Sequence, residues 1–219
     1  MRLMKTAMIA ILGLSVSGCA SVDVATRNAT VAPSAQAIAL GQVVGISDVK
    51  VNVSRNLKVS EAELYYPVAD IVWRGDARGN RHEQVAAIFT AGAEAASSKL
   101  NGNTKARLEI DVKRFHALTN KARYTVGGVH SISFMMSLKD PETGVNLIEP
   151  RKIKADLKAY GGQDAADADA RGETQKKRIT EHLTSVIMTQ IAGGIAIEAP
   201  AVSRNATALP KSAGVGSVY

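Results

Sequence analysis

The sequence lacks the residues that mark disulfide-rich domains and several common classes of enzyme. Its 219 residues contain one cysteine, Cys19, so no intramolecular disulfide can form. No Gly-x-Ser-x-Gly motif is present, and the glycine pairs at 127–128 and 161–162 do not stand between a predicted strand and a helix, as a phosphate-binding loop does. Aromatic residues make up only 4% of the chain. The length suits one domain whose core needs no disulfide or structural metal.

The N-terminus lacks an apolar run long enough to cross a bilayer. Residues 6–16 form an uncharged run of eleven, whereas a helix that spans a hydrocarbon core of ~30 Å needs about 20 apolar residues. Arg2 and Lys5 precede this run and supply the positive region of an export signal. Residues 1–18 are therefore predicted to be a signal peptide.

The end of this segment has the residue order of a lipoprotein processing site. Val16, Ser17 and Gly18 place one aliphatic and two small residues before Cys19, a pattern that resembles the lipobox of bacterial lipoproteins. The cysteine is needed because only a sulfur nucleophile accepts the diacylglyceryl group as a thioether. A lone free thiol would be a liability in an oxidising compartment, and lipidation consumes it. The alternative is an ordinary cleaved secretory signal that happens to contain a cysteine.

Lipidation would anchor the mature chain to a membrane. The resemblance implies two acyl chains on the thioether and a third on the new amino group, palmitate among them, and two chains suffice for stable anchoring. Ala20 replaces the aspartate that retains such proteins in the inner membrane. In a host with two membranes we therefore expect the inner leaflet of the outer membrane, with the domain facing the periplasm. That compartment excludes nucleic acid as a partner.

Changes in composition divide the mature chain into three parts. Residues 19–39 are rich in Ala, Ser, Thr and Val without a sustained period, and are predicted to be a lipidated tether. Residues 196–219 combine prolines with small residues and are predicted to be a flexible tail. A single globular domain is expected over residues 40–195.

Within the domain, the spacing of apolar residues predicts strands and helices. Apolar and polar residues alternate over 49–54, as in a half-buried strand. Residues 81–100 and 174–191 show helical spacing, and the glycines at 193–194 are expected to stop the second helix. Strands are predicted at residues 42–54, 105–113, 131–139 and 145–158. This order predicts an α+β fold, an antiparallel sheet of about four strands with two amphipathic helices packed on one face.

Four sequence motifs carry a resemblance to a known family. They are DIVWRGD at 70–76, RFHALT at 114–119, GGVHS at 127–131 and KADL at 154–157. Over residues 40–192 the chain resembles a family of uncharacterised alphaproteobacterial lipoproteins, whose folded part is a domain of unknown function. No activity is assigned to that family, so little function can be transferred. The overall plan also looks like the small accessory lipoproteins of envelope transport and assembly systems, an analogy of architecture that does not imply function.

Two sets of residues are candidates for catalysis, and neither is adopted. His116 ends one predicted strand and His130 begins the next, so a hairpin could bring two metal ligands together, but no third ligand of suitable geometry follows. Asp70 and Asp76 could form the carboxylate pair of a glycosidase, but turns and caps around Trp73 explain them more simply. We therefore expect no catalytic residue, no metal and no cofactor.

The strongest candidate for a binding surface is an aromatic segment with nearby arginines. Tyr65, Tyr66, Trp73, Arg74 and Arg78 lie within fourteen residues of sequence, and aromatic residues with arginine are favoured at protein interfaces. The alternative is that Trp73 and one tyrosine fill the core while the arginines are solvated. The formal net charge of +7 is a mild excess, which solvated strand charges explain as well as an anionic partner does.

The sequence thus predicts a lipoprotein that is anchored in the outer membrane and is not an enzyme. Its expected partners are the membrane, through lipid on Cys19, and an envelope protein, in a binding or accessory role in transport or assembly. The alternative is an envelope hydrolase or glycan-binding module that uses the segment from Asp70 to Arg81. A deep cleft lined by Asp70, Asp76 or the histidines would favour the alternative, and a flat or convex surface would favour the binding role.

Replacing the acceptor thiol tests the lipid anchor. Cys19→Ser removes the sulfur nucleophile at almost constant volume, so the protein is expected to leave the membrane pellet and enter the soluble envelope fraction. Fractionation followed by immunoblotting measures this. Ser17→Ala keeps a small residue in the lipobox and should stay in the pellet. Persistent membrane association of Cys19→Ser would contradict the anchor.

Overall fold

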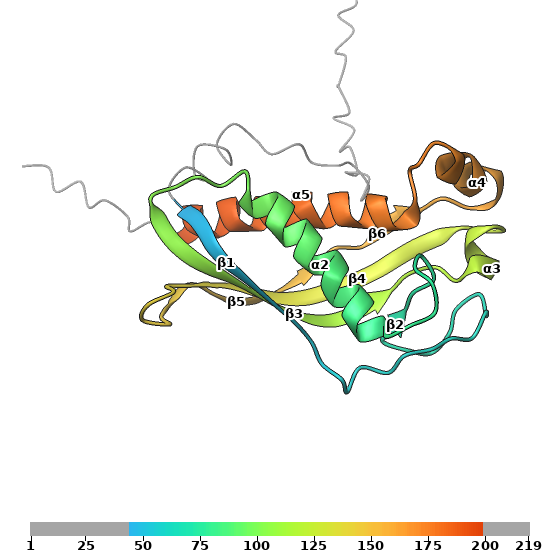
Figure 1. Ribbon diagram of the computed structural model, residues 1–219, viewed down its shortest axis with the longest axis horizontal. Helices are drawn as coiled ribbons and strands as arrows, with labels where there is room; N and C mark the ends of the chain where they lie inside the picture. The colour runs from blue at the N-terminus through green and yellow to red at the C-terminus, as the bar shows by residue number, and fades with distance from the viewer. Residues whose placement is uncertain (1–43, 199–219) are drawn as a thin grey trace, which may run out of the picture.

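The domain is a twisted sheet with two long helices lying along one of its faces (Figure 1). The structure is a computed structural model that describes residues 44–198, with side chains described over 44–192. The elements in chain order are β1 (Val44–Val53), β2 (Ile71–Val72), α2 (Arg81–Ser97), β3 (Thr104–His116), α3 (Asn120–Arg123), β4 (Gly128–Lys139), β5 (Asn146–Lys154), β6 (Leu157–Ala159), α4 (Gly162–Ala170) and α5 (Gln175–Glu198).

The sheet contains both parallel and antiparallel pairs. β1 runs parallel to most of β3, and β2 runs parallel to the end of β3. β4 pairs antiparallel with β3, and β5 and β6 pair antiparallel with two different stretches of β4. The expected antiparallel sheet of about four strands is therefore corrected to a mixed sheet of six strands. The reason is α2, which lies between β2 and β3 in the chain and runs back along the sheet. β3 therefore starts at the same end of the sheet as β1 and runs parallel to both β1 and β2.

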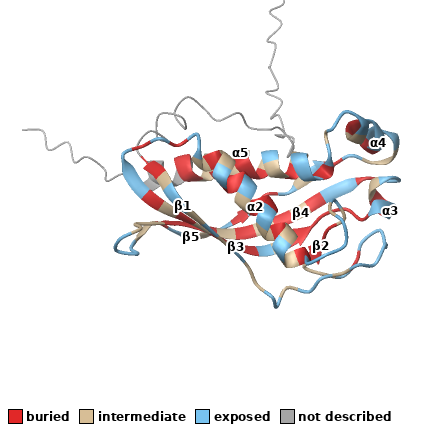
Figure 2. Cartoon of the chain, viewed as in Figure 1, coloured by how far each residue is buried: buried red, intermediate tan, exposed pale blue. Residues whose placement is uncertain are grey.

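α2 and α5 cover the same face of the sheet, as the sequence predicts, and they enclose the core between them and the strands. In Figure 2 buried residues lie along the strands and alternate with exposed residues along both helices. Phe89 of α2 is fully buried, with its ring centroid 6.1 Å from that of Phe115 in β3 and 5.3 Å from that of Phe134 in β4. The helices meet closely at Gly92, where an added Cβ would lie 3.1 Å from the Cβ of Leu183.

A β-bulge in β3 decides which side chains near its end face away from the helices. The register with β4 shifts between Val112 and Arg114, which leaves Lys113 as the extra residue. Strict alternation would turn Arg114 toward the core and Phe115 away from it. With the bulge, Phe115 packs in the core, while Arg114 and His116 lie on the face that the helices leave open.

The helical content differs from the sequence prediction in three places. α5 continues through the glycines at 193–194 to Glu198, since a glycine inside a helix costs only about 1 kcal/mol. α3 is a single turn, and α4 buries only Ala165 and Ala168, so neither shows the apolar periodicity on which the prediction relied. None of the helices within residues 44–198 is both long and apolar enough to span a membrane.

The packing around Phe89 gives a direct test of the core. Phe89→Ala is expected to lower the free energy of unfolding by about 3–5 kcal/mol, because it removes a fully buried ring and leaves a cavity. Ala87→Ser, on the exposed side of the same helix, should change that free energy by about 0.5 kcal/mol or less. Urea unfolding followed by circular dichroism measures both variants, and equal stabilities would contradict this packing.

Candidate functional site

The segment between β1 and α2 folds under the open face of the sheet and forms one end of the molecule (Figure 1). Tyr66 stacks on His116, with ring centroids 4.4 Å apart. Nε2 of His116 lies 2.8 Å from the carbonyl oxygen of Pro67, and because a carbonyl only accepts, this nitrogen carries the proton. Arg114 donates to the Tyr66 hydroxyl and to the carbonyl of Ala69. The residues that the bulge turns outward thus hold the segment in place.

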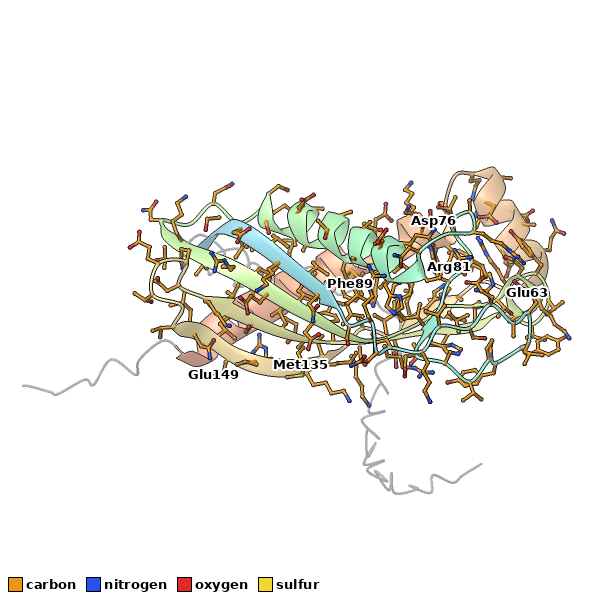
Figure 3. All side chains as sticks on the ribbon, turned by 60° about the horizontal axis from the view of Figure 1, so that its bottom comes forward. Glu63, Asp76, Arg81, Phe89, Met135 and Glu149 are labelled. Carbon is orange, nitrogen blue, oxygen red and sulfur yellow. The ribbon has the colours of Figure 1, made fainter. Side chains whose placement is uncertain are left out.

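Two arginines attach the other side of this segment. Arg81 is 4% exposed, and its Nε and Nη2 donate to the two carboxylate oxygens of Glu61 at 2.7 and 3.1 Å. Arg74 donates from Nε to Glu63 at 2.8 Å and from its other nitrogens to backbone carbonyls. Figure 3 shows Glu63 and Arg81 at this end of the molecule. Because protein acceptors occupy both guanidinium groups, these arginines are structural.

Trp73 lies in the core and not on the surface. Its exposed fraction is 0%, its ring meets that of Phe115 edge-on at 5.6 Å, and its indole N–H donates to Asp76 at 2.8 Å. Asp76 also accepts from Lys176 of α5 at 2.8 Å. Burial raises the pKa of Asp76, but the bonds from Lys176 and Trp73 outweigh it, so the pKa lies below the ordinary aspartate value. Trp73 and Arg74 are therefore removed from the predicted partner surface.

The exposed large apolar residues gather at the end of the molecule that this segment forms. Of the ten such residues in the described part of the chain, seven come from the stretches 64–68 and 124–129. The most exposed are Val68 at 97%, Val126 at 74% and Tyr66 at 66%. Patches of this kind mark interaction sites more often than the rest of a protein surface does. We call these seven residues the apolar end: Leu64, Tyr65, Tyr66, Val68, Tyr124, Val126 and Val129.

α3 joins the two stretches of the apolar end. Thr119 caps this turn by accepting the N–H of Ala122, and its hydroxyl donates to the carbonyl of Leu64 at 2.8 Å. The ammonium of Lys121 lies 4.6 Å from the centroid of the Tyr65 ring. The two stretches, which are about 60 residues apart in sequence, are therefore held by one short element.

Two glycines place the second stretch. Gly127 has a φ of +71°, which favours glycine, and a Cβ added at Gly161 would lie 2.4 Å from the nitrogen of Gly127. The two backbones therefore touch where β4 begins beside β6. This contact fixes a turn whose valines, Val126 and Val129, face outward with 74% and 52% of their surface exposed.

The rest of the open face carries charged side chains that pair across strands. Lys139 contacts Glu109 at 2.7 Å, and Arg107 contacts Asp48 at 2.8 Å. Met135 lies among them, on the part of the sheet that Figure 3 brings forward. Cross-strand ion pairs keep an exposed sheet face soluble. This face therefore contrasts with the seven uncharged side chains that make up the apolar end.

The two histidines considered as metal ligands lie on opposite faces of the sheet. His116 pairs with Ser131 on the open face, whereas His130 precedes Ser131, is 1% exposed and accepts the N–H of Leu118 at 3.4 Å. Burial, reinforced by the charges of Arg178 and Arg123, lowers the pKa of His130 to about 3. Within the described residues, no three or more His, Cys, Asp or Glu side chains form a group that could hold a metal ion.

Asp70 and Asp76, the carboxylates considered for glycan cleavage, serve local structure. Asp70 accepts the backbone N–H of Lys58 at 2.9 Å. Both oxygens of Asp76 are engaged, one by Trp73 and the other by Lys176. The recess beside Asp70 does not include Asp76, so the geometry gives no carboxylate pair facing a common substrate.

The remaining predicted site residues divide into two groups. Tyr65, Tyr66 and Arg78 are exposed, as a partner surface requires. The lipobox and the lipid attachment site lie outside the described residues, as do the predicted tether and most of the predicted tail: Val16, Ser17, Gly18 and Cys19, with residues 20–39 and 199–219. Five residues of the apolar end were not predicted: Leu64, Val68, Tyr124, Val126 and Val129. The only signal for them is an apolar residue in a stretch without periodicity.

Comparison with known proteins assigns the chain to a family. A family profile matches residues 44–207. This chain belongs to DUF6778, a family of unknown function. The match confirms the resemblance to a domain of unknown function. Among curated proteins, none matches this DUF6778 sequence.

Three solved structures show partial similarity to this DUF6778 domain. A protein of Caulobacter crescentus CB15, inferred to be a lipoprotein, is 11% identical with a TM-score of 0.36, over 75% of this chain and 98% of that chain. A Xanthomonas campestris protein of family DUF330 is 16% identical with a TM-score of 0.40, over 68% and 88% of the two chains. An uncharacterized protein is 13% identical with a TM-score of 0.32, over 72% and 92%.

The Glu61–Arg81 pair predicts a loss of stability in acid. The hydrogen bond from Arg81, together with the positive charge of Arg74, holds the pKa of Glu61 below the ordinary value of 4.5. A carboxyl whose pKa is lowered by folding stabilises the protein above its unfolded pKa, and this contribution is lost as the pH falls through the folded pKa. Glu61→Gln should therefore flatten the fall in unfolding free energy below about pH 4.5.

Urea titrations at several pH values measure this effect. Glu94→Gln, at an exposed glutamate of α2 outside the network, is the matched control and should keep the slope of the unmodified protein. An identical pH dependence for Glu61→Gln and the unmodified protein would show that the pair does not stabilise the segment.

Proposed function

We propose that this chain is a lipid-anchored binding module of the bacterial envelope, which is held to the outer membrane through Cys19 and presents the apolar end to a protein partner. The observation that supports this most is the position of the apolar end, far from Val44, the first described residue, which the predicted tether precedes in the sequence. The lipobox and Ala20 support the membrane address. A role as an accessory protein in envelope transport or assembly is part of the same proposal.

The start of β1 and the apolar end lie at opposite ends of the domain. β1 begins at Val44 beside Thr104, the first residue of β3, whereas the apolar end surrounds His116, the last residue of β3. At ~3.3 Å per residue these points are roughly 40 Å apart along the strand. Figure 1 shows the start of β1 and α3 at opposite ends. A domain tethered at one end leaves the other end free to contact a partner.

A protein partner suits the apolar end better than a membrane surface does. Tyr65, Tyr66 and Tyr124 keep 52%, 66% and 49% of their surface exposed, which amounts to roughly 250–400 Å² of aromatic surface. That is a large share of the ~800 Å² that each partner contributes to a stable interface. The charged side chains beside them have both signs, with Asp167 on α4 and Lys121 on α3, whereas binding to an anionic membrane surface is favoured by a cluster of basic residues.

A binding role also suits the polar groups of the domain better than catalysis does. The carboxylates of Asp70 and Asp76 cap or tie backbone and side chains, and His130 is buried and neutral. These groups are used for folding, which supports an adaptor without enzymatic activity.

Photo-crosslinking in intact cells tests the proposal. A benzoylphenylalanine placed at Val126 of the full-length protein is expected to give an adduct of one defined mass with an envelope protein, because this side chain is 74% exposed in the apolar end. The same probe at Ala87, exposed on the outer side of α2, is the control and should not give that adduct. Adducts that are identical at both positions, or absent at both, would overturn the proposal.

A further inference from the structure

A recess of about 390 Å³ opens beside the apolar end. Its apolar wall comes from Tyr66, Pro67 and Val68, and Lys58 and Arg114 bring positive charge to it. The recess lies under the open face of the sheet, where the bulge in β3 directs Arg114. It therefore combines an apolar wall with two cationic side chains next to the proposed partner surface.

Arg114 is held in this recess without a carboxylate partner. Its Nη1 donates to the carbonyl of Ala69 at 3.2 Å and its Nη2 to the hydroxyl of Tyr66 at 2.8 Å, and both acceptors are neutral. A guanidinium has five N–H donors, so three remain without a partner among the described residues. In contrast, Arg81 and Arg123 at the same end each contact a carboxylate.

Asp70 also lines the recess, but it forms no ion pair with Lys58 or Arg114. Its Oδ2 accepts the backbone N–H of Lys58 at 2.9 Å. Within the described part of the chain, its carboxylate comes within 4.0 Å of neither the Lys58 ammonium nor the Arg114 guanidinium. The three charged side chains together leave the recess with one net positive charge. An anionic group is thus the complement that this lining lacks.

We infer that the recess binds a carboxylate of the protein partner, on an acidic side chain or a chain terminus next to an apolar residue. The inference rests on the proposed function and specifies the chemistry of the contact. A carboxylate matches the planar fork of Arg114, which is already oriented by Tyr66 and Ala69. The neighbouring apolar residue packs against Tyr66 and Val68, which keep 66% and 97% of their surface exposed.

The test uses the full-length lipidated protein in cells, with benzoylphenylalanine at Val68 and, separately, at Val126. Mass spectrometry of the Val68 adduct should place the crosslink within a few residues of an Asp, a Glu or a C-terminus of the partner. Arg114→Gln is expected to reduce the yield at Val68 by about tenfold or more, since a hydrogen-bonded charge pair is lost. Arg114→Lys keeps the charge without the fork and should restore part of that yield.

Lys113→Gln is the matched control, because it removes the same charge one residue away, where Lys113 contacts Asp111 and does not line the recess. It should leave the Val68 adduct unchanged. A second arm changes the partner's acidic residue to its amide and should reduce the yield as Arg114→Gln does, independently of how Arg114→Gln folds. The two changes together should cost no more than either alone.

The outcomes separate this inference from the proposed function. Adducts at both positions that Arg114→Gln and the partner's amide variant leave unchanged would overturn the carboxylate contact and leave the binding module intact. A Val68 adduct with lipid, or with a partner segment that has no carboxylate, would also overturn it. Failure to obtain a protein adduct at Val126 would instead count against the proposed function itself.

Discussion

Burial of Trp73 determines where the rest of the candidate surface lies. The indole is fully buried against Phe115, whose ring in turn meets Phe89 of α2, so one aromatic series ties the segment before α2 to the central strand and to a helix. With Trp73 in the core, the chain just before it must cross the end of the sheet on its open side. Tyr66 then stacks on His116 and still remains 66% exposed. The first stretch of the apolar end, residues 64–68, is therefore held in place by buried contacts of the segment to which it belongs.

The bulge in β3 sets the direction of the strand side chains that contact the same segment. One extra residue at Lys113 lets Phe115 enter the core and turns Arg114 and His116 toward the segment that Trp73 fastens. Bulges are common next to functional sites because they redirect side chains without ending a strand. Here the two irregular features meet, and both the exposed tyrosines and the carboxylate-free arginine result from them. The start of β1, which follows the proposed tether in the sequence, lies about one strand length from this end.

Periodic parts of the sequence predicted the fold well, and aperiodic parts did not. The alternation in β3 and β4 and the helical spacing in α2 and α5 follow directly from burial of one face. The parallel pairing was missed although the order strand, helix, strand implies it. Trp73 could not be separated from Tyr65 and Tyr66 by sequence, because residues 55–80 have no period and only tertiary contacts decide which aromatic side chain is buried. Val126 and Val129, on either side of Gly127, show no periodic pattern in the sequence, so their exposure could not be predicted.

We expect a protein partner to cover the apolar end in the cell envelope. Hydrogen exchange of the backbone amides tests it most directly, comparing purified protein with protein in isolated native envelopes. If a partner covers the apolar end, amides of residues 64–68 and 124–129 exchange more slowly in envelopes, while amides on the outer side of α2 exchange at an unchanged rate. Equal exchange of these two stretches in both preparations would contradict it.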